Sequence, residues 1–288
     1  MKMTKRALML SIVLTATIGL GLSQAAFAQP PGGRGGVNRG PDPRVEQRTY
    51  QFEETDEELA YALFVSSKVA KDESAPLIVA LHGLGGDGNS LLRGRALELA
   101  EEGGYILVGP LGYNPSGWFG SPVIVMGGRR GGGPGAEAAP AGPDPERLAE
   151  LSELDVRTVM AMIREEFTVD DDRTYLMGHS MGGAGALFLG QKYADEWAAV
   201  ASIAPAAFMM QPNSAEILQP MKDAGVPLLI IQGGADTVVP ATNTRAWAES
   251  MEAIEMEGEY IEMPEGDHGS VINDGMPAIF DLFEANTR

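Results

Sequence analysis

The chain has 288 residues, of which 44% are hydrophobic, so it is long enough for one large domain with a buried core. It has no cysteine, which excludes disulfide stabilisation and leaves the core alone to stabilise the fold. Acidic residues number 40 and basic residues 21, a net charge of −19, and such a surface repels nucleic acid and anionic membranes.

The first 28 residues have the three parts of a signal peptide. Lys2, Lys5 and Arg6 precede an apolar run over 7–22, and an A-x-A cleavage pattern ends at Ala28. A membrane anchor is the alternative, but the run is short for a bilayer-spanning helix. We therefore expect cleavage near Ala28, secretion to the periplasm or the cell exterior, and no stable membrane association afterwards.

Residues 29–44 are rich in glycine and proline, which predicts a flexible linker before a catalytic domain over 45–288. Two apolar runs between Thr49 and Val65 flank the acidic turn Glu53–Glu58. This pattern predicts an antiparallel hairpin at one edge of a sheet.

The rest of the domain alternates strands with helices, which predicts a mostly parallel α/β sheet. The expected strands are 77–81, 105–108, the start of 173–192, 199–203, 228–231 and 259–263, and the expected helices are 90–102, 145–167 with Asp144 as a possible cap, the end of 173–192, 214–223, 242–254 and 275–286.

Two stretches stand apart from this alternation. Residues 127–145 are so rich in Gly, Pro and Ala that we expect an excursion inserted into the domain. Asp170, Asp171 and Asp172 are expected in a turn before a strand; a solvated turn is the simpler interpretation, and a calcium site is the alternative.

Gly178-His179-Ser180-Met181-Gly182 has the G-x-S-x-G pattern of a nucleophile elbow, between an apolar strand and a helix of small residues. So sharp a turn brings the two glycines close together, where a Cβ would clash. The pattern predicts that Ser180 is a nucleophile. The alternative is a glycine-rich connection in which the serine only caps a helix.

A serine nucleophile needs a base, and the base needs an orienting acid. Asp236 and His268 follow later strands, and the order Ser180, Asp236, His268 is that of α/β-hydrolases. Asp267 and Glu265 are rivals for the acid, but Asp267 adjoins the base, where neighbouring side chains tend to point apart.

The remaining site predictions concern histidines, amides and aromatic rings. His82 and His179 are expected to hydrogen-bond backbone around the site. Backbone N–H groups of Met181 and Leu84 are the expected oxyanion donors, with Gly83 as the alternative to Leu84. Trp118 either stacks on substrate or packs under the excursion.

The motifs LHGLGG, GHSMGG, GGADTVVP and GDHG, with GYNPSGWFG between the first two, resemble those of the α/β-hydrolase superfamily. The most similar groups are secreted single-domain serine esterases: the polyhydroxybutyrate-depolymerase/feruloyl-esterase-like and the prolyl-oligopeptidase-family-like hydrolases. The resemblance, from about Tyr50 onwards, implies an α/β-hydrolase fold with helices on both faces of the sheet. Many relatives have histidine where this chain has Gln232, and the 127–145 stretch has no firm counterpart.

We therefore expect a secreted serine hydrolase that cleaves carboxylic esters of plant polymers, polyesters or their fragments through an acyl-Ser180 intermediate. Its expected partner is a small-molecule or polymeric ester, without cofactor, metal or nucleic acid. A serine peptidase acting on short peptides is the alternative, and a non-catalytic binding protein on a hydrolase fold is a second one.

Overall fold

The computed structural model describes residues 40–70, 73–122 and 144–288. The predicted signal peptide, residues 29–39 of the linker and residues 127–143 of the excursion lie outside these ranges. Residues 40–44, the described part of the predicted linker, form a turn in which the guanidinium of Arg44 pairs with the Asp42 carboxylate at 2.9 Å.

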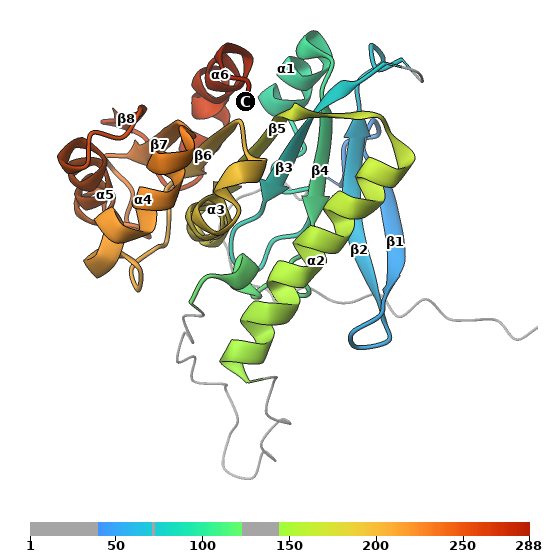
Figure 1. Ribbon diagram of the computed structural model, residues 1–288, viewed down its shortest axis with the longest axis horizontal. Coiled ribbons are helices and arrows are strands. Elements are labelled where there is room, and N and C mark those ends of the chain that lie inside the picture. Colours follow the sequence, from blue (N-terminus) through green and yellow to red (C-terminus); the bar gives the residue numbers. More distant parts are fainter. Residues whose placement is uncertain (1–39, 71–72, 123–143) are drawn as a thin grey trace, which may run out of the picture. The chain divides into compact units, whose positions relative to one another are not determined.

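One eight-stranded sheet forms the centre of the domain (Figure 1), in the order β1-β2-β4-β3-β5-β6-β7-β8. The strands are β1 Glu46–Phe52, β2 Glu57–Val65, β3 Ala75–Leu81, β4 Ile106–Pro110, β5 Val169–His179, β6 Ala199–Ile203, β7 Leu228–Gly233 and β8 Gly258–Met263. The β1–β2 and β2–β4 pairs are antiparallel and every other pair is parallel. This confirms the mostly parallel sheet with an N-terminal hairpin at one edge.

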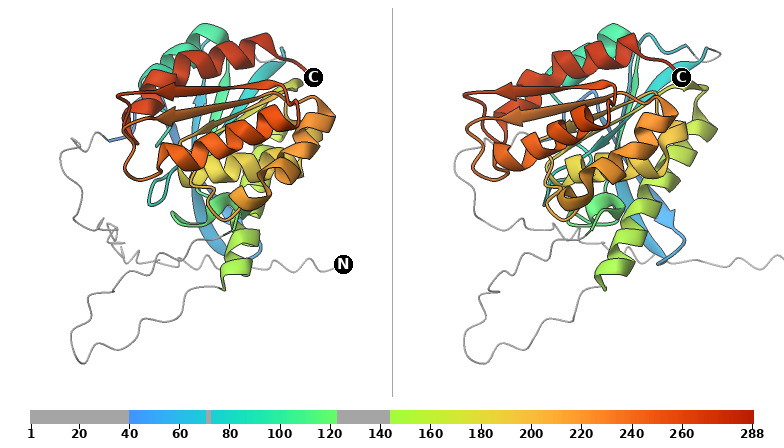
Figure 2. Two further views of the ribbon diagram at one scale, coloured as in Figure 1. Left: turned by 90° about the vertical axis from the view of Figure 1, so that its left-hand side faces the viewer. Right: turned by 60° about the vertical axis from the view of Figure 1, so that its left-hand side comes forward.

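Helices cover both faces of the sheet, as Figure 2 shows. They are α1 Arg95–Gly103, α2 Pro145–Glu166, α3 Met181–Lys192, α4 Ser214–Ala224, α5 Ala241–Ala253 and α6 Ser270–Ala285, with short 3₁₀ turns at Trp118–Gly120, Ala194–Glu196 and Gln211–Asn213. The apolar faces of α1 and α6 pack in one core layer, and those of α2, α3, α4 and α5 pack in the other.

Strand β3 shows why the central strands read as continuous apolar runs. Leu77, Val79 and Leu81 enter one core layer, whereas Ile78 and Ala80 enter the other. Because successive side chains of a strand point to opposite faces, a strand covered on both faces must be apolar at every position.

Two predicted helix starts are wrong. Helix α1 begins at Arg95 rather than Ser90, because Gly94 before it has φ 54°, which interrupts helical geometry. Helix α6 begins at Ser270 rather than Gly275, because the Asp267 carboxylate accepts the N–H groups of Gly269 and Ser270 at its first turn.

The Asp170–Asp172 prediction is also corrected, because these residues begin strand β5 instead of forming a separate turn. Asp170 pairs with Arg173 at 2.7 Å and Asp171 with Arg164 at 3.2 Å. In the described ranges, no group of three His, Cys, Asp or Glu side chains is placed to hold a metal ion. Asp144 occupies the N-cap position of α2, but its side chain makes no capping hydrogen bond.

None of the described helices combines the length and the apolar character that crossing a membrane requires.

Candidate active site

The sharp turn between β5 and α3 places Ser180 at the carboxyl edge of the sheet. Its backbone angles are φ 57° and ψ −113°, a region that residues with a Cβ rarely adopt. Holding such a conformation costs about 1–3 kcal/mol, and strained residues of this kind cluster at functional sites. Ser180 is 8% exposed.

The glycines around Ser180 are required by close backbone approach. A Cβ on Gly178 would lie 2.0 Å from the carbonyl oxygen of Gly182, and a Cβ on Gly182 would lie 2.1 Å from that of Leu81. Both contacts are far inside van der Waals distance, and the atoms that would be struck are backbone. The predicted clash between the two glycine positions is confirmed.

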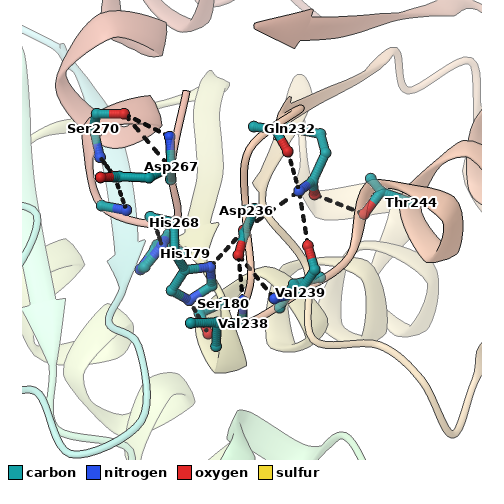
Figure 3. Close-up of polar contacts among 12 residues, drawn as sticks. His179, Ser180, Gln232, Asp236, Val238, Val239, Thr244, Asp267, His268 and Ser270 are labelled. Carbon is teal, nitrogen blue, oxygen red and sulfur yellow. Dashed lines mark hydrogen bonds and ion pairs between the residues drawn. The ribbon is translucent and has the colours of Figure 1, made fainter. Parts of the chain in front are cut away.

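The three predicted members of the site lie together in a hydrogen-bonded chain (Figure 3). The imidazole Nε2 of His268 is 2.9 Å from Ser180 Oγ, and its Nδ1 is 2.7 Å from Asp236 Oδ2. When Nδ1–H donates to the carboxylate, Nε2 is left to accept the hydroxyl proton of Ser180. Residues that follow three different strands thus meet at one edge of the sheet.

Asp236, rather than its rivals, is the carboxylate that faces His268. Its side chain is buried, and its Oδ1 accepts the N–H groups of Val238 at 2.8 Å and Val239 at 2.9 Å. The Asp267 carboxylate turns towards the first turn of α6, and the hydrogen bonds that it accepts there lower its pKa. Asp236 thus faces His268, whereas the Asp267 carboxylate points away from it.

His179 supports the loop that carries His268. Its Nε2–H donates to the carbonyl oxygen of His268 at 2.8 Å, and the two rings are 4.6 Å apart. Burial, and next the charge of His268, lower the pKa of His179 to about 4, so the ring is neutral around pH 7.

The ring of His82 lies between two carbonyl oxygens, those of Gly83 and Leu111, at 2.8 Å from each. It therefore connects the loop after β3 with the loop after β4. The prediction that His82 and His179 hydrogen-bond backbone is confirmed.

The loop after β3 lies against Ser180, as an oxyanion site requires. A Cβ on Gly83 would be 3.4 Å from Ser180 Cβ, and Met181 is the first residue of α3. In the described part of the chain, neither Leu84 N–H nor Met181 N–H donates to another protein group. Their use as oxyanion donors stays a prediction.

Trp118 is 4% exposed and belongs to the core layer that contains α2 and α3. Phe119 beside it is fully buried. This burial favours packing of Trp118 in the core over stacking on substrate. A contact of Trp118 with substrate stays a prediction.

Helix α2 anchors this aromatic loop with two buried polar residues that the sequence analysis missed. Ser152 Oγ accepts Phe119 N–H at 2.8 Å, while the Asp155 carboxylate accepts N–H groups of Gly112 and Tyr113 and the Tyr50 hydroxyl. Burial raises the pKa of Asp155, and these hydrogen bonds oppose that shift. Asp155 lies four residues after Leu151, so both are on the apolar face of α2. A carboxylate at a position where an apolar residue is expected was the signal in the sequence that could have identified it.

In sequence, the chain is similar to proteins described as esterases. The model of the Putative esterase family matches residues 137–270. The putative esterase NocK from Nocardia uniformis subsp. tsuyamanensis is 29% identical over 182 residues, which cover 63% of this chain and 46% of that protein. The chain thus spans about half the length of this curated relative.

Solved structures show the fold. A thermostable esterase superposes with a TM-score of 0.62 at 24% identity, covering 85% of this chain and 64% of that one. The CE1 ferulic acid esterase of Anaeromyces mucronatus gives 0.62 at 22% identity, covering 84% and 91%. These likenesses show that the fold is that of the α/β-hydrolases.

Proposed function

We propose that this protein of α/β-hydrolase fold is an esterase, which cleaves carboxylic esters through an acyl intermediate on Ser180. The observation that carries the proposal is the hydrogen-bonded chain from Ser180 through His268 to Asp236, with distances of 2.9 and 2.7 Å, at a strained elbow. A serine hydroxyl is almost fully protonated at neutral pH, so it attacks a carbonyl only with a base within hydrogen-bond reach.

The proposed reaction has two steps. Ser180 Oγ attacks the ester carbonyl carbon while His268 Nε2 takes its proton, and His268 then gives that proton to the leaving alcohol. Water, activated by the same imidazole, attacks the acyl-serine and releases the acid. Asp236 holds the imidazole and stabilises its charged form, and the N–H groups of Met181 and Leu84 bind the oxyanion.

Exposed apolar side chains on the loops around Ser180, His268 and Asp236 support esters with apolar groups as the substrates. Leu84 is 47% exposed, Met209 65% and Val238 61%. Leu84 follows Gly83, which lies against Ser180, and Val238 N–H donates to Asp236. The loop of Met209 is tied to the elbow where Ala206 N–H donates to the Ser180 carbonyl oxygen. Acyl esters of plant polymers, polyesters and their fragments offer such groups.

The protein is proposed to act after export. The support is the N-terminal sequence pattern that ends at Ala28, together with the acidic composition, which keeps the protein away from anionic membrane surfaces.

We predict that Ser180→Ala lowers kcat on p-nitrophenyl esters by at least about 10³-fold, because the nucleophile is lost. Initial rates over a series of acyl lengths, with matched anilides, measure the effect and identify the preferred acyl group. Labelling of the wild type by a fluorophosphonate, located at Ser180 by peptide mass, is the independent readout. A Ser180→Ala variant with wild-type rates would remove the proposal.

A further inference from the structure

Gln232, near the end of β7, is fully buried behind Asp236, on the side away from Ser180 (Figure 3). Its Nε2 lies 2.9 Å from the carbonyl oxygen of Val239, 3.0 Å from that of Gly233 and 3.3 Å from Asp236 Oδ2. Its Oε1 accepts the hydroxyl of Thr244, on α5, at 2.7 Å. Every polar atom of the amide therefore has a protein partner.

The surroundings allow one orientation of this amide. The three atoms near Nε2 are two carbonyl oxygens and a carboxylate oxygen, all of which only accept hydrogen bonds. The NH₂ group must therefore face Asp236, and the amide oxygen must face Thr244. Thr244, which is also fully buried, supplies the donor that holds the oxygen on that side.

The amide joins the two ends of the segment that contains Asp236. Gly233 precedes Asp236 and Val239 follows it, and one NH₂ group binds the carbonyl oxygens of both. On the carboxylate itself, Val238 and Val239 N–H groups bind Oδ1, whereas His268 and Gln232 approach Oδ2. Leaving a buried amide or carboxylate without a hydrogen-bond partner costs free energy. These hydrogen bonds therefore restrict the movement of residues 233–239, which carry Asp236.

We propose that Gln232 and Thr244 are positioning residues that fix the Asp236 carboxylate at the distance and angle that His268 requires. The proposal rests on the function proposed above. Neither residue touches the reacting atoms, and Thr244 acts through Gln232, which acts through Asp236. Misplacement of the carboxylate would leave substrate binding intact and would slow the proton transfers of His268.

Thr244 provides a matched pair of variants. Thr244→Val keeps the side-chain shape and removes the hydroxyl, so the amide loses the donor that orients it; kcat should fall by about 10-fold with KM within about twofold. Thr244→Ser keeps the hydroxyl and should recover most of the wild-type kcat.

Gln232→Leu removes every hydrogen bond of the amide and should lower kcat by about 10- to 100-fold. Gln232→His, which offers one ring N–H, should fall between Gln232→Leu and the wild type.

A second readout does not depend on activity. The His268 Nδ1 proton, bonded to Asp236, should give a low-field proton NMR resonance in the wild type and in Thr244→Ser. The resonance should be shifted or lost in Thr244→Val and Gln232→Leu, including in a Ser180→Ala background. Thermal melts establish that each variant is folded, and the Thr244 pair decides the matter if Gln232→Leu does not fold.

Unchanged kcat and resonance in folded Thr244→Val would overturn the positioning role, as would a raised KM at unchanged kcat. If the wild type itself hydrolyses no ester, the proposed function fails, while the resonance still decides whether Gln232 and Thr244 position Asp236.

Discussion

Of the three histidines in the chain, His268 and His179 lie beside Ser180, and His82 lies in the loop after β3, whose Gly83 is against Ser180. His268 bonds two side chains, Ser180 and Asp236, whereas His179 and His82 bond main-chain oxygens. Residue type therefore indicates proximity to the site, and the hydrogen-bond partner distinguishes a candidate base from a supporting residue.

His179 should make stability depend on pH. Its pKa is lowered to about 4 in the fold, mainly by burial, whereas an unfolded chain binds the proton near 6.5. Between these values the unfolded state binds more protons, so the free energy of unfolding decreases as pH falls from 6.5 towards 4. The contribution reaches at most about 3 kcal/mol.

Urea denaturation of the wild type and of His179→Gln at several pH values measures this contribution. Glutamine keeps an N–H for the His268 carbonyl but does not titrate, so the wild type should lose its advantage over the variant as pH falls. A difference that stays constant from pH 7 to pH 4 would contradict the lowered pKa.

The elbow between β5 and α3 depends on a close approach of backbone segments that only glycine permits. Gly178, the second-last residue of β5, lies against Gly182 in the first turn of α3, and Gly182 also lies against Leu81 at the end of β3. The same approach brings the loop after β3 to Ser180. The same two glycines thus allow β3, β5 and α3 to pack together and bring the residues of the site to Ser180.

Gly178→Ala should therefore destabilise the fold by about 2 kcal/mol or more, because the atoms struck are backbone and cannot move aside. Gly40→Ala is the control: among the described residues, nothing lies within 4 Å of its added Cβ, so its effect should stay within about 0.5 kcal/mol. Urea denaturation compares the two. Equal stability of both variants would show that the elbow can relax.

For the whole molecule, the parallel strands bring their carboxyl ends to one edge, where open α/β sheets place their sites. The net charge of −19 becomes −22 when residues 1–28, which hold three basic residues and no acidic one, are removed.

We predict that export from a bacterial host yields a protein that begins at Gln29, because small residues at Ala26 and Ala28 form the cleavage pattern. Intact mass and N-terminal sequencing of the exported fraction test this. Ala28→Trp should retain the uncleaved chain at the membrane. Wild-type protein found uncleaved in the membrane fraction would favour the anchor alternative.

Much of the fold was predictable because its signals are local. Continuous apolar runs identified the buried strands, and the order of Ser180, Asp236 and His268 at strand ends predicted which residues would meet. The starts of α1 and α6 were missed, because they depend on one backbone angle at Gly94 and on one capping carboxylate at Asp267.

The elbow, the parallel sheet and the candidate nucleophile, base and acid could be predicted, because strand periodicity and glycine spacing are local and chain order is written in the sequence. The burial of Trp118, the hydrogen bonds from the aromatic loop to Asp155, and the contacts that link Thr244 through Gln232 to Asp236 are visible only in the folded chain. These contacts join elements that the sheet brings together, and burial makes each polar group depend on its partner.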